Sequence, residues 1–581
     1  MPSGEFFTKR LSVWLVDVPL IIGVSLLLFF RGIGDTPFYD KAEAREALVI
    51  WEIHKSGDWI LPLRNGEEIP AKPPFYHWLG ALASTPVDRV DELTSRLPSA
   101  VLGLVGILLT YATGAVLWGR GAGLIAALVL STSFEWRTAR AARVDMALTF
   151  VLLCSFLFFL YLYRTGSSRA KATVFGFFVG LAILAKGPLG FVLPYFTVLI
   201  FLWSNKDLAF LKKFHSFTAL SVCALVAGSW YLLALWQGGQ EFLTMVIKEN
   251  VNTVVGKEAG HPHPFWWYIP YLFQHMAPWS LFFPSIAVFL YRYRRKLAEE
   301  NLLYLIVWFA TVFIFFSIFK QKRTVYILSA YPAVALLFGA WWQKLKDGTL
   351  PNEPLFITRL AAYLNAGSFL IMAVLLILQV TNRNPLAYLN PMLGPKDVAD
   401  MTRVAGLLTE HRITILLWSV VCGLGGILLV LSARKRAWGA FMGGTAAVMV
   451  ISLNNVQTFD TALAKEYSIK PFMNRVVSVV KNAPLFFYES EDYPVMFYAG
   501  RHIHQYKPPL KIASSPYYVL FWENEWKPIR QNEGLIVRAT SQSTDRIDPN
   551  RAHLVLVEVK TPDALPSSAQ SAEIEPTSLG N

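Results

Sequence analysis

The chain has 581 residues, of which 54% are hydrophobic and only 16% are charged. An average soluble domain carries about one quarter charged residues, so this composition excludes an ordinary soluble enzyme. The formal net charge of +13 is explained by basic loops beside membrane spans rather than by a nucleic-acid surface. We therefore expect contact with membrane lipids and none with nucleic acid. All three cysteines lie in apolar runs, so no disulfide framework is expected.

Apolar runs recur along the first 455 residues, and the longer ones match the roughly 30 Å hydrocarbon thickness of a bilayer. They predict 13 membrane-spanning helices, near residues 13–30, 97–117, 122–135, 144–163, 172–186, 188–204, 216–236, 278–291, 301–319, 323–342, 360–380, 412–432 and 438–454. With a cytoplasmic N-terminus, the loops predicted to face the cytoplasm are all net basic, as the positive-inside rule requires. An odd number of spans then places the chain after about residue 455 outside.

The first outer loop, residues 31–95, contains two short segments with helical spacing, 42–54 and 75–83. Both are too short and too polar to cross a membrane, so we expect them to lie in the interface with their apolar faces among lipid headgroups. The second outer loop, 237–277, carries the aromatic run 265–268, which is typical of interfacial anchors. Residues 1–455, including both loops, are predicted to form one membrane domain.

From about residue 456 the composition changes to that of a soluble α/β domain, which we expect to extend to residue 562. Helices are predicted at 471–481 and 493–499, and strands at 484–488, 517–522, 535–538 and 553–559. This part has no glycine-rich phosphate loop, Cys/His cluster or nucleophile elbow, so catalysis is expected in the membrane domain. Residues 563–581 are rich in Ser, Pro and Glu and predict a disordered tail.

A minority of basic residues departs from the positive-inside pattern because they lie on the predicted outer side. They are Arg45, Lys72, Arg96, Arg137, Arg140, Arg143, Lys186, Lys320, Lys322 and Arg323. Charges at a membrane edge are costly unless they are paired or bind something. Any one of them could form a salt bridge with an outer carboxylate such as Asp145. For the whole set, an anionic ligand at the outer membrane surface is the more economical explanation.

Several motifs then resemble those of a known superfamily, in the same order over roughly residues 10 to 345. The motifs are Phe38-Tyr39-Asp40 with Glu43-Ala44-Arg45, Ser56-Gly57-Asp58-Trp59, Lys72-Pro73-Pro74, Arg143-Val144-Asp145, Lys186-Gly187, the stretch from His261 to Tyr268, and Lys320-Gln321-Lys322-Arg323. They resemble the membrane glycosyltransferases related to protein O-mannosyltransferases and lipid A 4-amino-4-deoxyarabinose transferases. The resemblance implies a polytopic α-helical GT-C fold with about 13 spans and a small extracytoplasmic α/β domain, in a bacterial inner membrane.

The resemblance also implies a donor and an acceptor. The donor would be a polyprenyl-phosphate-linked sugar reached from the outer leaflet, and the acceptor a lipid or glycan, such as lipid A, on the same side. Cations at headgroup depth suit the donor phosphate and the charge that builds on it as the glycosidic bond breaks. We assign this role to Lys72, Arg45, Lys320, Lys322, Arg323, Lys186 and Arg143. The candidate catalytic carboxylates are Asp145, Glu43 and Asp40.

Two positions depart from the superfamily pattern. Ala42 stands where the motif usually has an aspartate that is often given the role of base, so an altered or lost activity stays open. Ala71 stands where the arabinose transferases have a glutamate that can help to bind a cation. His261 and His263 could still hold a divalent metal, since imidazole is a common metal ligand, although two loop histidines are more often simply polar. No other cofactor is expected.

Three other functions remain open at this point. The acceptor could be a protein, as in the protein O-mannosyltransferases. The chain could instead transport or flip an anionic lipid, which would favour ionisable groups at mid-membrane and an internal repeat. The basic residues that depart from the positive-inside pattern cluster at one face, and no internal repeat is visible in the sequence. Both observations favour a transferase. The third alternative, suggested by Ala42, is a non-catalytic scaffold.

Overall fold

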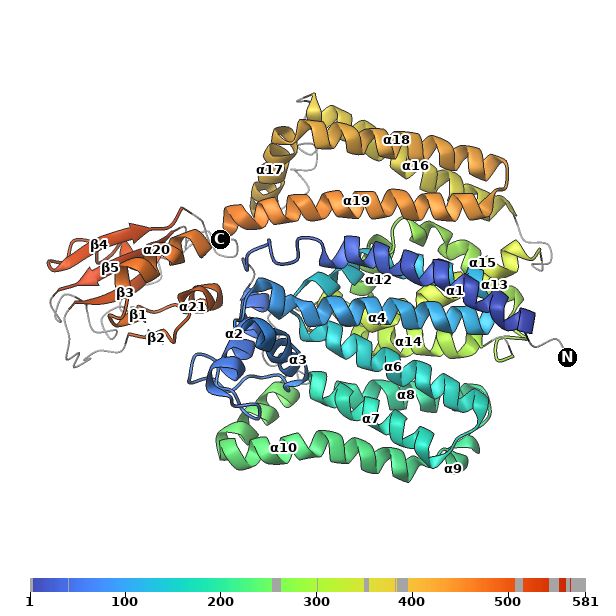
Figure 1. Ribbon diagram of the computed structural model, residues 1–581, viewed down its shortest axis with the longest axis horizontal. Helices are drawn as coiled ribbons and strands as arrows, with labels where there is room; N and C mark the ends of the chain where they lie inside the picture. Colours follow the sequence, from blue (N-terminus) through green and yellow to red (C-terminus); the bar gives the residue numbers. More distant parts are fainter. Residues whose placement is uncertain are drawn as a thin grey trace, which may run out of the picture.

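The computed structural model describes residues 4–39, 41–252, 263–299, 301–348, 355–381, 383, 395–506, 516–542, 553–560 and 565. Figure 1 shows a long helical body with a small sheet domain at one end. The N-terminus lies at the opposite end of the body. Two short helices of the first loop lie between the body and the sheet domain. The chain thus consists of a helical part and a small C-terminal part that contains the sheet.

The helical body begins with α1 (Gly4–Ser25), η1 (Leu26–Phe30), α2 (Lys41–Ser56), α3 (Phe75–Ser84), η2 (Thr85–Val87), α4 (Glu92–Trp118), α5 (Arg120–Ser131) and η3 (Phe134–Arg140). It continues with α6 (Val144–Thr165), α7 (Arg169–Lys186), α8 (Leu189–Ser204), α9 (Phe210–Lys213), α10 (Ser216–Ile247), η4 (Lys248–Asn252), η5 (Phe265–Trp267), α12 (Tyr268–His275) and η6 (Trp279–Phe282). The last members are α13 (Phe283–Arg292), α14 (Leu302–Ile318), η7 (Thr324–Ala330), α15 (Tyr331–Lys346), α16 (Leu355–Val380), α17 (Pro395–Glu410), α18 (Arg412–Arg434) and α19 (Trp438–Tyr467).

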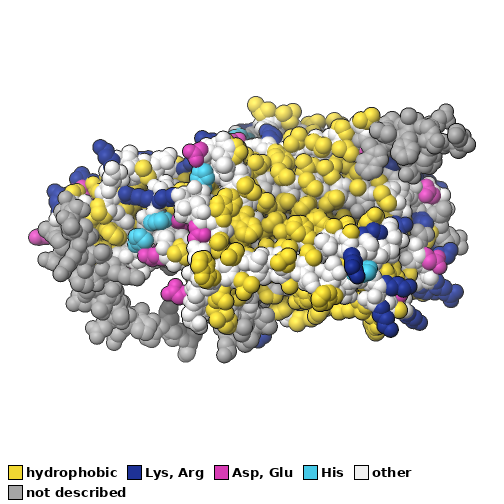
Figure 2. Space-filling view, turned by 60° about the horizontal axis from the view of Figure 1, so that its bottom comes forward, with side chains coloured by type: hydrophobic (Ala, Val, Ile, Leu, Met, Phe, Trp, Pro, Cys, Tyr) yellow, Lys and Arg dark blue, Asp and Glu magenta, His cyan; other side chains and the backbone are white. Residues whose placement is uncertain are grey.

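The surface of the body suits a bilayer. On the face in Figure 2, hydrophobic side chains cover the middle of the body, and Lys and Arg gather at the end opposite the sheet domain. Of the helices described, seven are long and apolar enough to cross a membrane by length and composition: those at 92–118, 144–165, 216–250, 324–346, 356–380, 412–434 and 438–480. Four further apolar helices are shorter. A helix lies within each predicted span, but α17 was not anticipated.

The two loop helices form where the sequence predicts them, but they do not lie open on lipid. The helix α2 buries residues on several sides, among them Glu43, Glu46, Leu48, Ile50 and Ile53. One side of it packs on α3 and α4, and another is covered by helix α21 (Tyr493–Ala499) of the sheet domain. The expectation of a helix with its apolar face among headgroups is therefore wrong for α2, because protein covers that face.

The C-terminal domain is an α/β domain, as predicted. Its elements are α20 (Lys470–Val480), β1 (Leu485–Phe487), α21, β2 (His504–Gln505), β3 (Tyr517–Trp522), α22 (Glu523–Trp526), β4 (Leu535–Thr540) and β5 (Leu554–Val559). The strands form one mixed sheet in the order β2-β1-β3-β5-β4, with β1 parallel to β2 and β3. Strands β3 and β5 are buried along their whole length, and apart from Glu558 all their residues are apolar. The predicted boundary at 455/456 falls inside α19.

The sheet domain is bound to the first loop and to the start of α4 by polar contacts. The hydroxyl of Tyr498 accepts a hydrogen bond from the backbone N–H of Phe38 (2.6 Å) and donates one to Glu92 (2.9 Å). The imidazole of His502 lies 2.6 Å from the carboxylate of Glu52 on α2. The ring of Phe497 packs edge-on against Phe38, with 5.0 Å between centroids. The domain and the first loop therefore lie on the same side of the helical body.

Asn65 makes the most directional contact between the loop and the domain, which leads to a prediction. Its side-chain amide donates to the carbonyl of Ile503 and accepts from the N–H of the same residue, both at 2.9 Å in a buried position. Asn65→Ala would leave both backbone groups unsatisfied, so we expect the free energy of unfolding to fall by about 2 kcal/mol or more. Thermal unfolding in detergent measures this, with exposed Asn482→Ala as the control. Equal melting temperatures for the two variants would contradict the assignment.

Candidate functional site

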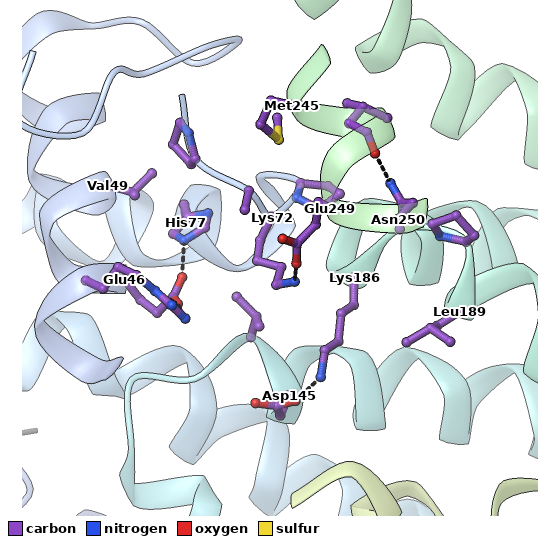
Figure 3. A pocket seen from close by; sticks show the side chains of 18 of the residues that line it. Glu46, Val49, Lys72, His77, Asp145, Lys186, Leu189, Met245, Glu249 and Asn250 are labelled. Atoms are coloured by element: carbon purple, nitrogen blue, oxygen red, sulfur yellow. Dashed lines mark hydrogen bonds and ion pairs between the residues drawn. The ribbon is translucent and has the colours of Figure 1, made fainter. Parts of the chain in front are cut away.

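A cavity of about 700 Å³ lies where the first loop meets the ends of the helices nearest the sheet domain. Its walls come from α2, the segment before α3, the start of α6, the end of α7, the η4 turn after α10, and the residues between α14 and η7. Figure 3 shows side chains of α2, the segment before α3, α6, α7 and η4 around it, with Lys72, Glu249, Lys186 and Asp145 near its middle. Segments far apart in the sequence thus combine into one site at a single end of the body.

Both charged and aromatic side chains line this cavity. Among the described residues, the cationic ones are Arg45, Arg64, Lys72, Arg143, Lys186, Lys248 and Arg323. The carboxylates are Glu46, Glu68, Asp145 and Glu249, and the aromatic residues include Trp230, Tyr231, Tyr326 and Tyr493. Seven formal positive charges therefore face four negative ones. Such a surplus of positive charge attracts an anionic ligand. The protein wall has a low dielectric constant, so it screens this attraction only weakly.

The ion pair between Asp145 and Lys186 forms one wall of the cavity. Asp145 is the second residue of α6 and Lys186 the last of α7, so the antiparallel packing of these two helices brings both to the same end. Both side chains are nearly buried, and the ammonium of Lys186 lies 4.3 Å from the centroid of the Tyr326 ring. Gly187 follows with φ of +73°, a conformation that suits glycine and lets the chain turn directly into α8. The pair gives Lys186 a fixed direction into the cavity.

A second ion pair, between Lys72 and Glu249, crosses the cavity from the opposite side. Lys72 precedes Pro73 and Pro74; proline cannot donate a backbone hydrogen bond, so helix α3 begins only at Phe75 and Lys72 stays in the loop. Glu249 lies in η4, immediately after α10. Figure 3 shows the two side chains meeting in the middle of the view. The sequence argument found Lys72 but not Glu249, because no local pattern marks a carboxylate at the end of a long span.

A third charged group contains Arg45, Glu46 and His77. Arg45 donates to Glu46 at 2.8 Å, and Nε2 of His77 lies 2.8 Å from the other oxygen of Glu46. Burial opposes ionisation of Glu46, but the hydrogen bond at His77 and the charge of Arg45 hold its pKa well below the ordinary value. The charge of Glu46 in turn raises the pKa of Arg45. Glu46 thus stays ionised and holds Arg45 at the cavity wall; sequence reasoning missed both Glu46 and His77.

Glu43, a predicted catalytic carboxylate, lies elsewhere. Glu43 is not one of the described residues that line the cavity. Its two oxygens accept from the guanidinium of Arg96 at 2.8 and 2.9 Å, and one also accepts from the N–H of Ala142 at 2.8 Å. Burial works against its ionisation, yet Arg96 and this backbone donor lower its pKa. Glu43 therefore joins α2 to α4 and to the segment before α6, and its oxygens have no free direction toward a substrate.

The tetrad from Lys320 to Arg323 is divided by the structure. Arg323 lines the cavity, and so does Gln321, which was not predicted. The ammonium of Lys322 is buried and donates to the backbone carbonyls of Phe319 and His263, and its burial lowers its pKa. Lys320 is exposed, and its carbonyl accepts from the N–H of His263 at 3.0 Å. Of the predicted phosphate-binding set, the structure brings five residues to the cavity: Arg45, Lys72, Arg143, Lys186 and Arg323.

The remaining predicted residues concern the extra carboxylate and the metal. Asp40 and His261 lie outside the described residues. His263 stacks on Trp267 with 4.5 Å between ring centroids, and Ala71 lines the cavity at the position where the resemblance expects a glutamate. Among the residues the structure describes, no three His, Cys, Asp or Glu side chains come together as a metal would need. The divalent metal stays a prediction from the sequence.

A second cavity of about 720 Å³ adjoins the first. The two share Ala42, Arg45, Arg143, Arg323 and Tyr493 in their walls. The second cavity extends along η3 instead of toward α10. Glu135, Arg137 and Thr138 of η3 form part of its wall. Tyr493 belongs to α21, so the sheet domain supplies part of the wall of both cavities.

Comparison with known proteins agrees with this arrangement. The family model for dolichyl-phosphate-mannose-protein mannosyltransferase matches residues 71–232. An uncharacterized protein of Aquifex aeolicus is 33% identical over 55% of this chain, and the chain covers 62% of that relative. An undecaprenyl phosphate-alpha-4-amino-4-deoxy-L-arabinose arabinosyl transferase of Pseudomonas fluorescens is 26% identical over 74% of this chain and 76% of its own length.

Among solved structures, ArnT from Cupriavidus metallidurans bound to undecaprenyl phosphate superposes with a TM-score of 0.74. The superposition covers 93% of this chain and 97% of that one at 18% sequence identity. A likeness at this identity shows the fold alone. The chain is thus similar in sequence to the dolichyl-phosphate-mannose-protein mannosyltransferase family and to 4-amino-4-deoxy-L-arabinose arabinosyl transferases, and similar in fold to ArnT.

Proposed function

We propose that the protein transfers a sugar from a polyprenyl-phosphate donor to a lipid or glycan acceptor of the lipid A type. The observation that carries this is the surplus of cations in a cavity at one end of the membrane body. A phosphate attached to a membrane lipid needs cations at headgroup depth, and a cavity at this end of the apolar body would supply them there. Several relatives are named as undecaprenyl phosphate-alpha-4-amino-4-deoxy-L-arabinose arabinosyl transferases, and these names support the same class of donor.

The proposed topology follows from the same cavity. The helical body would cross a bacterial inner membrane 13 times, with its basic end toward the cytoplasm and the sheet domain outside. The basic side chains at the end opposite the sheet domain support this orientation. The donor would reach the cavity from the outer leaflet, and the first loop with the sheet domain would cover it from the water side.

In the proposed reaction, the bond between the sugar's anomeric carbon and the phosphate oxygen breaks, and its electron pair stays on the phosphate. Lys72, Lys186 and Arg323 are placed to stabilise this charge, so the leaving oxygen needs no proton. In the structure Lys72 and Lys186 are paired with Glu249 and Asp145. These carboxylates direct the ammonium groups into the cavity until the donor's phosphate joins them. Asp145 would thus act mainly by placing Lys186.

A divalent metal at His261 and His263 is kept as a proposal without a catalytic step. The ring of His263 stacks on that of Trp267. If this histidine serves as a ligand, the removal of divalent metal by a chelator would lower activity.

Mass spectrometry of envelope lipids, glycans and proteins from cells with and without this chain tests the proposal. We expect one pentose- or hexose-sized mass increment on a lipid or glycan that is lost with the gene and restored by the wild-type chain, but not by Lys186→Ala. An increment on a protein would instead identify a protein acceptor. No sugar product in any fraction, together with lipid translocation in liposomes, would replace the transferase by a transporter.

A further inference from the structure

The second cavity contains a carboxylic acid that no step so far uses. Glu135 lies in η3, just past the end of α5 at Ser131, and its side chain is almost buried. It lines the second cavity together with Arg143 and Arg323, which also line the donor cavity. Glu135 therefore shares a cavity with two residues of the donor site, and Lys72 and Glu249 do not line that second cavity.

The surroundings of Glu135 differ from those of the donor-cavity carboxylates. Each of those is joined to a cation: Glu46 to Arg45, Glu68 to Arg64, Asp145 to Lys186 and Glu249 to Lys72. Glu135 instead has an imidazole as its neighbour, with 3.3 Å between one of its oxygens and Nδ1 of His275. Among the described residues, no Lys or Arg lies within ion-pair distance of it; Arg137, next but one along the chain, pairs with Asp460 on α19.

The neighbours of Glu135 favour a carboxyl group that exchanges a proton. Burial lowers the pKa of His275 to about 4, so its imidazole is neutral near pH 7. Burial and the charge of Asp145 raise the pKa of Glu135 to about 7. A hydrogen bond from Thr324 and the positive charges of Arg143 and Arg137 lower this pKa, but by less. A base with a pKa close to the working pH combines a large ionised fraction with a useful proton affinity.

Among the described residues, the positions where the sequence suggests a base do not offer a free carboxylate. Position 42 is an alanine and lines both cavities. Glu43 is fully engaged by Arg96 and Ala142, and Asp145 is bound to Lys186. Glu135 lines the second cavity from η3, whereas Ala42 and Arg45 line it from α2.

We propose that Glu135 is the general base that takes the proton from the acceptor hydroxyl, and that this hydroxyl approaches through the second cavity. The inference rests on the proposed sugar transfer. As the acceptor oxygen bonds to the anomeric carbon, its proton passes to the carboxylate of Glu135. The bond from that carbon to the phosphate breaks at the same time, and its electrons remain on the phosphate. The proton later leaves Glu135 to water through the second cavity, which restores the base.

The rate of transfer then depends on the ionised fraction of Glu135. In the wild type, the rate at saturating donor should rise with pH through an apparent pKa near 7 and level off above it. His275, with its lowered pKa, does not titrate in this window. The other charged or titratable groups around Glu135 are Arg137, Arg143, Asp145 and Tyr331. The two arginines keep their charge throughout.

The experiment compares wild type with Glu135→Gln, Glu135→Asp and Glu135→Ala in the full-length protein in nanodiscs, with exposed Glu241→Gln on α10 as the matched control. Transfer is measured against pH, and binding of undecaprenyl phosphate is measured separately as a test of folding. We expect Glu135→Gln to bind undecaprenyl phosphate like wild type but to transfer at least 100-fold more slowly. Glu135→Asp should keep part of the rate and the rising pH limb, and added formate should restore part of the activity of Glu135→Ala.

The outcomes separate this inference from the proposed function. If wild type transfers sugar and Glu135→Gln transfers at the same rate with the same pH profile, Glu135 is not the base, and the transferase assignment stands. The base role is also overturned if slow transfer in Glu135→Ala is unaffected by formate and Glu135→Asp is as slow as Glu135→Gln, because that pattern marks a structural role. If wild type forms no product with any acceptor fraction, the proposed function fails and the inference fails with it.

Discussion

Replacing Lys72 by alanine is expected to lower sugar transfer by roughly 100- to 1,000-fold, which is the usual loss when one preorganised donor to a developing negative charge is removed. Lys72 faces the donor cavity from the loop before α3, where Glu249 holds its ammonium in place. Without it, the charge on the leaving phosphate would lose its partner on that side, while Lys186 remains on the other. Transfer from a purified undecaprenyl-phosphate sugar in nanodiscs measures the effect.

Two controls make the Lys72 result specific. Lys212→Ala, at the opposite end of the body in α9, removes an exposed lysine without touching the cavity and should transfer sugar normally. Membrane insertion and thermal stability of Lys72→Ala should match wild type, because this side chain is partly exposed and belongs to no apolar cluster. If Lys72→Ala keeps full transfer, the phosphate does not bind where the cavity places it.

Replacing Arg96 by alanine is expected to have the largest effect on stability, about 3–5 kcal/mol, because it leaves a buried carboxylate without its counter-charge. Arg96 is 2% exposed and donates to both oxygens of Glu43 and to the backbone carbonyls of Ile33 and Thr36 at 2.8 and 2.5 Å. Its guanidinium also lies 4.8 Å from the centroid of the Phe38 ring. The side chain of Arg96 thus connects α4 to Ile33 and Thr36, which precede α2, and to Glu43 within α2.

The midpoint of thermal unfolding in detergent measures the Arg96 effect. The control is Arg89→Ala, whose side chain is mostly exposed and pairs with Asp91 at the surface, where such a pair contributes little. The double variant Arg96→Met/Glu43→Leu should recover part of the loss, because it removes both charges together. Equal midpoints for Arg96→Ala and Arg89→Ala would show that the buried pair does not hold the loop.

The parts of the structure that follow from local sequence were predicted well. The helices α2 and α3 and strands β1, β3, β4 and β5 lie close to their predicted positions, because periodicity and proline placement are local signals. The count of 13 spans is harder to read, since helices such as α13 are short and their length does not decide whether they cross. The continuation of α19 through Tyr467 was missed because a change in composition does not end a helix.

The site was predictable only as far as an unusual position of charge could reveal it. Lys72, Arg45, Lys186 and Arg323 stand out because basic residues on the outer side need an explanation. Their partners Glu249 and Glu46 depend on which segments meet in space, so no spacing in the sequence marks them. Lys322 shows the converse: its position in the tetrad suggested a phosphate ligand, but its ammonium binds two backbone carbonyls. A motif indicates where charge is concentrated, and only packing decides which charges face the ligand.

Binding of undecaprenyl phosphate, compared with undecaprenol, tests the central claim most directly. The two lipids share the chain and differ by the phosphate, so the comparison isolates the interaction assigned to the cationic cavity. In native mass spectrometry of the purified full chain, we predict that the phosphate lipid binds and that Lys72→Ala and Lys186→Ala weaken this binding about tenfold or more, while undecaprenol binds weakly to all three. Equal binding of both lipids to wild type, unchanged in the variants, would contradict the account.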